Sequence, residues 1–133
     1  MSTDAVIVDS CIWISIMRQG RDPRQELMPL LRAGHLYNCG VIRAEVLRGM
    51  KVESRKRDLE AFFDIIPEVP TDARIWRLVS NMGWTLARMG KTPPVTDLTI
   101  AACTMRTRAT LITADAHFED IPGLNLSEDL PEV

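Results

Sequence analysis

Four acidic residues occupy positions from which a side chain can readily do chemistry. Asp9 follows the continuous apolar run of residues 5–8, which is typical of a strand buried on both faces of a parallel sheet. Asp115 follows a second buried run, residues 109–113, in the same way. Because open α/β sheets bind their ligands at the carboxyl ends of strands, both acids are candidates for a functional site.

Glu45 and Asp97 are the other two candidates. The helical spacing of residues 41–50 places Glu45 about one turn into the helix after the second predicted strand. Asp97 lies in the first turn of the helix that leads to the last core strand. Strand carboxyl ends and helix amino ends share one edge of a parallel sheet, so we expect all four carboxylates to meet at that edge.

The chemistry that such a set permits is metal-dependent. Carboxylates gathered at one site repel one another, and their pKa values rise unless a cation compensates the charge. No Lys or Arg is adjacent in sequence to Asp9, Asp97 or Asp115. Mg²⁺ and Mn²⁺ prefer carboxylate oxygens and water, whereas the lack of Cys/His ligand spacing argues against zinc. A carboxylate-bound ion that activates water indicates phosphodiester hydrolysis without a protein nucleophile.

Each acid also has a purely structural interpretation. The alternatives are a helix cap for Asp9, interaction with the helix dipole for Asp97, an Asx turn for Asp115 and a surface ion pair between Glu45 and Arg48. Taken one at a time, these interpretations are about as good as the functional one. Together they must explain four acids at one edge of the sheet, which favours a functional site.

The elements that must position the acids alternate between strands and helices. Asp22-Pro23 predicts a helix start, and Gly34 its end. Thr71 is the predicted cap of a long helix, and Gly40 a turn after the second strand. Strands are expected at 5–8, 35–39 and 109–113, a minimal strand or link at 68–69, an edge strand at 124–126, and helices at 11–17, 22–33, 41–50, 55–66, 71–89 and 96–106. This order predicts an α/β fold, a three-layer α/β/α arrangement with a parallel sheet of four to five strands flanked by helices.

The composition is that of an ordinary globular protein. With 133 residues, 46% apolar and 26% charged, we expect a single domain over residues 1–133. The net charge of −2 weakens a nucleic-acid interpretation but leaves room for a local basic face. The three cysteines lack C-x-x-C spacing and predict buried free thiols in a reducing cytosol. No apolar run approaches the ~20 residues of a membrane span, so we expect a cytoplasmic protein that does not enter a membrane.

Four segments, in order, resemble the motifs of PIN-domain ribonucleases, and most closely those of VapC-type toxins from bacterial toxin–antitoxin pairs. The segments are Val8-Asp9-Ser10 with Trp13-Ile14, residues 41–49 around Glu45, residues 97–102 from Asp97, and residues 111–118 with a T-x-D-x-H-F turn. Each segment alone is a loose match, but the four together span nearly the whole chain.

This resemblance implies a Mg²⁺- or Mn²⁺-dependent endoribonuclease that acts on RNA. The catalytic residues and metal ligands would be Asp9, Glu45, Asp97 and Asp115, with Ser10 and Thr113 as supporting hydroxyls. The resemblance also implies an antitoxin whose tail crosses the active-site groove, and a homodimer. Candidate RNA-binding residues are Arg18, Arg21, Arg24, Arg43, Arg48 and Lys51, and candidate dimer contacts are Trp76, Met82, Trp84 and Met89, although such an apolar stripe more often faces a core.

Two other classes of protein remain open at this point. A non-catalytic PIN-fold interaction module would not need the four acids. An aspartate-based phosphotransfer enzyme is disfavoured, because the haloacid-dehalogenase pattern wants a second Asp where Cys11 stands, and no Lys follows the last core strand as in receiver domains. His117 is a candidate ligand or proton donor, but a lone histidine after a strand is more often a turn residue.

Overall fold

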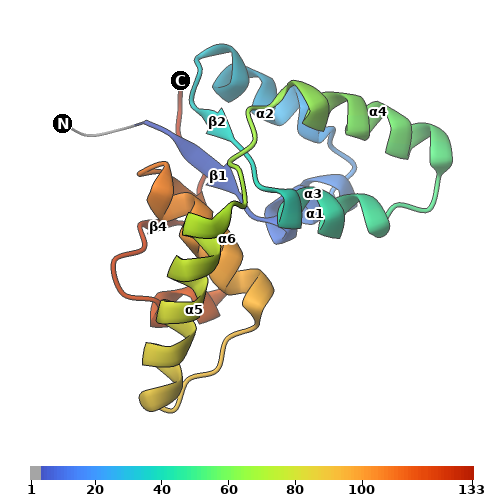
Figure 1. Cartoon of the computed structure of the whole chain (residues 1–133). Helices are drawn as coiled ribbons and strands as arrows, with labels where there is room; N and C mark the ends of the chain where they lie inside the picture. The colour runs from blue at the N-terminus through green and yellow to red at the C-terminus, as the bar shows by residue number, and fades with distance from the viewer. Residues whose placement is uncertain (1–3) are drawn as a thin grey trace.

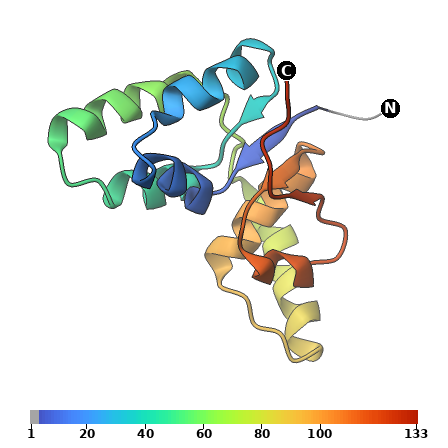
Figure 2. The ribbon, with the colours of Figure 1, turned by 180° about the vertical axis from the view of Figure 1, so that it is seen from behind.

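The computed structural model describes residues 4–133, which fold into a four-stranded parallel sheet, six α-helices and one 3-10 helix. The sheet order is β2-β1-β3-β4, with β1 (Val6–Val8), β2 (Leu36–Tyr37), β3 (Thr110–Ile112) and β4 (Leu126–Ser127). The helices are α1 (Ser10–Arg18), α2 (Pro23–Arg32), α3 (Gly40–Arg48), α4 (Glu53–Ile65), α5 (Ala73–Arg88), α6 (Val95–Arg106) and the 3-10 helix η1 (Ala116–Asp120). Helices α1–α4 gather on one side of β1, and the α5–α6 hairpin lies on the other (Figures 1 and 2). This is the three-layer α/β/α arrangement predicted from the sequence.

The centre of the sheet is the parallel pair β1–β3. Val8 is in register with Ile112, and Val6 pairs on the other side with Leu36 of β2. Ile7 and Leu111, the middle residues of the two strands, are completely buried. Helices cover both faces of such a pair, which explains why both strands are continuous apolar runs without polar alternation.

An aromatic cluster fixes α1 against the sheet. Trp13 on α1 is buried, and its ring centroid lies 4.5 Å from that of Phe63 and 6.0 Å from that of Phe62, both on α4. The Trp13 indole N–H donates a 3.0 Å hydrogen bond to the carbonyl of Val8. Since α1 begins directly after Asp9, this packing also fixes the end of β1 and the point from which the Asp9 side chain starts.

The α5–α6 hairpin packs closely. Ile75, Val79 and Leu86 form the buried face of α5, and most of α6 is buried along its length. A Cβ atom added to Gly83 of α5 would lie 3.2 Å from Leu98 Cδ1 of α6, so a residue without a side chain suits this contact. The packing holds the first turn of α6, and with it Asp97, in a fixed place.

The structure corrects three details of the sequence interpretation. Asp72, not Thr71, caps α5, because its carboxylate accepts the N–H groups of Arg74 and Ile75. Gly40 is the first residue of α3 rather than a turn. The last edge strand, predicted at 124–126, is β4 at Leu126–Ser127. Of the two alternatives left open for residues 68–69, the link is the correct one, since only an isolated bridge joins Glu68 to Asn38. Prolines at positions 67 and 70 flank this segment and cannot donate ladder hydrogen bonds, which limits its extent.

Two further predictions concern thiols and membranes. All three cysteines are free, with Cys39 and Cys103 buried and Cys11 partly exposed. Within residues 4–133, the helices are too short or too polar for any of them to cross a bilayer.

Candidate active site

Asp9 directly follows β1 as the N-cap of α1 and is the most buried of the four acids, with 5% of its surface exposed. Its backbone N–H extends the sheet ladder by donating to the carbonyl of Ile112 at 2.9 Å. Oδ1 of its carboxylate accepts the N–H of Ser10 at 2.8 Å, and Oδ2 accepts the hydroxyl of Thr113 at 2.8 Å. The parallel register therefore places Thr113, which follows β3, beside the acid that follows β1.

Thr113 also organises the loop that carries Asp115. Its Oγ accepts the N–H of Asp115 at 3.0 Å. The Asp115 carboxylate in turn caps η1, accepting the backbone N–H of His117 at 2.9 Å, and lies 3.0 Å from the His117 Nδ1. Asp115 thus forms the turn that its structural interpretation predicted, while the same turn brings it to the carboxyl edge of the sheet. The His117 ring is otherwise exposed.

Glu45 reaches the same edge from α3. The hydroxyl of Ser10 donates a 3.2 Å hydrogen bond to Glu45 Oε1, which links the first turn of α1 to the middle of α3. Among the described residues Glu45 forms no ion pair with Arg48, so the surface-pair interpretation of Glu45 is wrong. Ser10 and Thr113 both donate hydrogen bonds to the acids, Ser10 to Glu45 and Thr113 to Asp9.

Asp97 completes the set from the first turn of α6. Burial raises the pKa of its carboxyl, and the negative charges of Asp115, Asp9 and Glu45 raise it further, while His117 acts in the opposite direction. Asp97 therefore lies within electrostatic reach of each of the other three acids. No lysine or arginine in residues 4–133 forms an ion pair with any of them.

The donor chemistry fits a hard divalent cation. The four side chains offer carboxylate oxygens and an uncompensated negative charge, which Mg²⁺ and Mn²⁺ would neutralise. As the side chains stand in the described part of the chain, no three His, Cys, Asp or Glu residues form a set that could enclose a metal ion. The arrangement is thus a shared edge of acids whose oxygen atoms are of the type that a hard divalent cation prefers.

Cys11 is a neighbour of the site that the sequence interpretation missed. The sequence predicts only a buried free thiol at this position, yet its Sγ lies 3.3 Å from Asp9 Oδ2 and 3.6 Å from Thr113 Oγ. Burial raises the pKa of the Cys11 thiol. The signal in the sequence was its position two residues after Asp9, which becomes the first turn of a helix beginning at Ser10.

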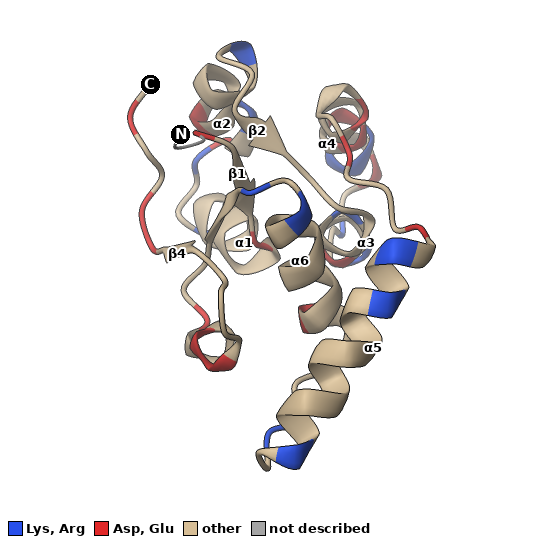
Figure 3. Ribbon diagram, turned by 60° about the vertical axis from the view of Figure 1, so that its left-hand side comes forward, with Lys and Arg blue, Asp and Glu red and all other residues tan. Residues whose placement is uncertain are grey.

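The predicted RNA-binding residues divide into two groups. In the first group the charge is already paired: Arg21 with Glu26 at 2.7 Å, Arg24 with Asp22 at 3.1 Å and Arg43 with Asp64 at 2.7 Å. In the second group, Arg18, Arg48 and Lys51 are exposed and form no ion pair within residues 4–133. Figure 3 shows further basic residues near the two ends of α5, with an acidic residue directly before the helix begins.

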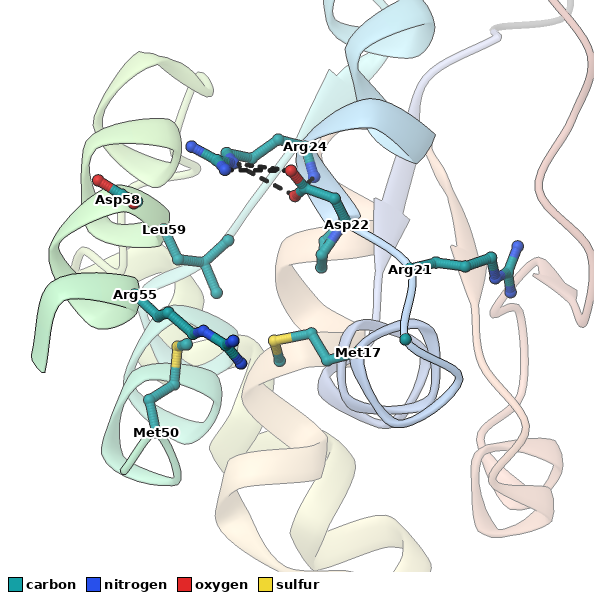
Figure 4. Close-up of a pocket in the computed structure, with 10 residues that line it drawn as sticks. Met17, Arg21, Asp22, Arg24, Met50, Arg55, Asp58 and Leu59 are labelled. Carbon is teal, nitrogen blue, oxygen red and sulfur yellow. Dashed lines mark hydrogen bonds and ion pairs between the residues drawn. The ribbon is translucent and has the colours of Figure 1, made fainter. Parts of the chain in front are cut away.

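A surface pocket between α1, α2 and α4 lies apart from the acids. It has a volume of about 410 Å³, and its apolar lining includes Met17, Met50 and Leu59, with the Asp22–Arg24 ion pair at its rim (Figure 4). A smaller pocket of about 180 Å³ is lined by Thr113, Asp115 and residues of the β4 region. Of these two pockets, only the smaller includes one of the four acids.

The comparisons with known proteins agree with this fold. The PIN domain model matches residues 6–124, so the chain belongs to the PIN domain family. Its fold is similar to VapBC2 from Rickettsia felis bound to a promoter DNA fragment (TM-score 0.75, 20% identity, covering 92% of this chain and 97% of that one). It is similar to DNA-bound VapBC from Salmonella typhimurium (TM-score 0.74, 16% identity, covering 96% of this chain and 98% of that one). It is also similar to VapBC-1 from nontypeable Haemophilus influenzae (TM-score 0.72, 20% identity, covering 92% of this chain and 96% of that one). No curated protein sequence matches significantly.

Proposed function

We propose that this protein is a Mg²⁺- or Mn²⁺-dependent endoribonuclease and the toxin of a type II toxin–antitoxin pair. One observation carries the proposal: Asp9, Glu45, Asp97 and Asp115 reach one edge of the sheet from four different elements, and the other three raise the pKa of Asp97. The family is of the nuclease type and generally uses divalent metals, which supports this chemistry.

The chain's own residues would hold the cation and position the RNA. Asp9 would be the most firmly held ligand, because Ser10 and Thr113 donate to its two oxygens. Ser10 links Glu45 to the Asp9 carboxylate, and Thr113 links Asp115 to it. A bound divalent cation supplies an activated water and charge stabilisation at the phosphodiester. Of the six predicted RNA-binding residues, Arg18, Arg48 and Lys51 are the best able to neutralise phosphates, because they are exposed and form no ion pair within residues 4–133.

Two protein partners belong to the proposal. Structural neighbours of this chain are toxin–antitoxin complexes, which supports a cognate antitoxin that covers the active-site groove. A homodimer is supported by α5, where the exposed fractions of Trp76 and Trp84 are 47% and 64%. Aromatic side chains this exposed are typical of protein interfaces. We further propose that residues 1–133 act as a single PIN-like domain in the cytoplasm.

The proposal is tested by cleavage of a mixed pool of structured RNAs. Wild-type protein, stripped of any co-purified partner, is compared with Asp97→Asn in Mg²⁺, in Mn²⁺ and in EDTA. Cutting that needs the metal and disappears in the variant is the expected result. Metal-independent cutting that survives in Asp97→Asn would overturn the proposal. If wild type cuts nothing, Mn²⁺ titration calorimetry decides the matter: a wild type that binds no Mn²⁺ is the non-catalytic interaction module.

A further inference from the structure

The carboxylate of Asp9 has more hydrogen-bond donors around it than the supporting hydroxyls alone provide. Oδ2 accepts the Thr113 hydroxyl at 2.8 Å and also the thiol of Cys11 at 3.3 Å. Oδ1 accepts the N–H of Ser10 at 2.8 Å, while the Ser10 hydroxyl lies 3.5 Å away and is nearer to Glu45 Oε1 at 3.2 Å. Thus Oδ2 has two side-chain donors, and Oδ1 has one close donor.

These contacts decide which oxygen is open to a cation. A carboxylate oxygen has about two lone-pair sites. Thr113 and Cys11 fill both sites on Asp9 Oδ2. Oδ1 has one close donor, the Ser10 N–H, because the single proton of the Ser10 hydroxyl has its nearer acceptor in Glu45 Oε1, at 3.2 Å against 3.5 Å to Oδ1. Oδ1 is also the Asp9 oxygen nearer to Glu45, because the Ser10 hydroxyl lies within hydrogen-bond distance of both Oδ1 and Glu45 Oε1.

We propose that Cys11 is a positioning residue that, together with Thr113, restricts Asp9 to binding a divalent cation through Oδ1 alone. This inference rests on the proposed function, because it concerns the cation of the same site. The thiol is well placed for this role, because it starts in the first turn of α1, next to the buried end of β1, and also contacts Thr113 Oγ at 3.6 Å. Two strand ends therefore hold it against the carboxylate.

The consequence is a preference among cations. Mg²⁺ demands a compact octahedral set of ligands, while Ca²⁺ takes more oxygens and accepts a carboxylate through both of them. An Asp9 that offers only Oδ1 disfavours the two-oxygen mode. Cys11 thereby selects for Mg²⁺ and Mn²⁺ against Ca²⁺, although it is not itself a ligand.

Titration calorimetry of the metal-free protein with MgCl₂, MnCl₂ and CaCl₂ tests this inference without relying on activity. Cys11→Ala removes the donor, and we expect the ratio of Ca²⁺ to Mg²⁺ affinity to rise about tenfold, the scale on which partners of metal ligands act. Cys11→Ser keeps a donor and is the matched control, with a ratio close to that of wild type. Cys11→Val, which fills a similar volume without donating, should behave as Cys11→Ala and replaces it if the alanine variant fails to fold.

The outcomes separate this inference from the proposed function. If wild type binds the cations and both Cys11→Ala and Cys11→Val keep the wild-type ratio, Cys11 only packs, and the inference is wrong while the proposed function stands. If Cys11→Ser shifts the ratio as far as Cys11→Ala, the hydrogen bond is not the cause, and the inference is again wrong. If wild type binds none of the three cations, the proposed function fails and this inference fails with it.

Discussion

The Thr113 hydroxyl and the Asp9 carboxylate form a 2.8 Å hydrogen bond between residues 104 positions apart. Thr113 is 5% exposed and Asp9 equally so, so this bond to a charged group is shielded from water. The same oxygen of Thr113 accepts the N–H of Asp115. One side chain therefore ties the acid after β1 to the acid after β3, and the site depends on the pairing of these two strands.

Replacement of Thr113 by valine tests this link. Valine has nearly the same shape but no donor, so it leaves the Asp9 carboxylate short of a hydrogen bond, at a cost of about 1.5–3 kcal/mol in the free energy of unfolding. Urea unfolding of the metal-free protein measures the change. Thr113→Ser keeps the hydroxyl and should lose clearly less stability. Equal stability of the valine variant and wild type would show that the bond contributes nothing to the fold.

The raised pKa of Asp97 predicts how stability depends on pH. Because its pKa in the folded protein lies above the ordinary value of 3.8, folding favours the protonated carboxyl. The stability that the protonated Asp97 carboxyl allows is fully present at a pH below its pKa in the unfolded chain. This stability is lost as the pH rises through its pKa in the folded protein, because the carboxylate then ionises beside other negative charges. Asn is neutral at every pH, so metal-free Asp97→Asn should melt at a higher temperature than metal-free wild type near neutral pH.

A melting series from acidic to neutral pH measures this difference. The gap between Asp97→Asn and wild type should be smallest in acid and should widen as the wild-type carboxylate ionises. Taking the difference between the two proteins cancels the titration of other groups, such as Asp22 and Asp72, whose pKa values are lowered by Arg24 and Arg106. A variant that melts below wild type at neutral pH would mean that Asp97 is not repelled by its neighbours.

The sequence predicted the positions of the acids better than their detailed surroundings. Apolar runs ending at Asp9 and Asp115 predicted the parallel strands, and parallel topology alone brings strand and helix ends to one edge. Contacts between distant residues were beyond a linear pattern: nothing local indicates that Ser10 reaches Glu45 or that Cys11 joins Thr113 at the same carboxylate. The Arg43–Asp64 ion pair was missed for the same reason. The Arg21–Glu26 and Arg24–Asp22 pairs are local, and the sequence interpretation missed them although their partners stand five and two positions away.

The division of the basic residues predicts which of them bind RNA. In an Asp97→Asn background, in which we expect no cutting, Arg48→Gln with Lys51→Gln should make the negative slope of log affinity against log salt shallower by about 0.7 for each lost phosphate contact. Arg24→Gln is the matched control, since Asp22 already holds that charge and the slope should change less. Fluorescence anisotropy over a range of salt concentrations gives the slopes. Equal slopes for the double variant and its background would remove Arg48 and Lys51 from the RNA interface.

We expect the exposed Trp84 side chain to contribute to self-association of the chain. Its ring is 64% exposed on α5, with the Arg88 guanidinium 4.9 Å from the ring centroid. If α5 forms the dimer interface, Trp84→Gln removes an aromatic anchor, costing roughly 2 kcal/mol or more. That loss corresponds to a rise of about thirtyfold in the dimer dissociation constant.

Ile65→Gln on α4, with 60% of Ile65 exposed, is a matched control that should leave the dimer dissociation constant unchanged. Sedimentation velocity over a dilution series measures both variants. An unchanged mass with weakened RNA binding would assign Trp84 to the substrate, because exposed tryptophan and arginine also suit base stacking and phosphate contacts.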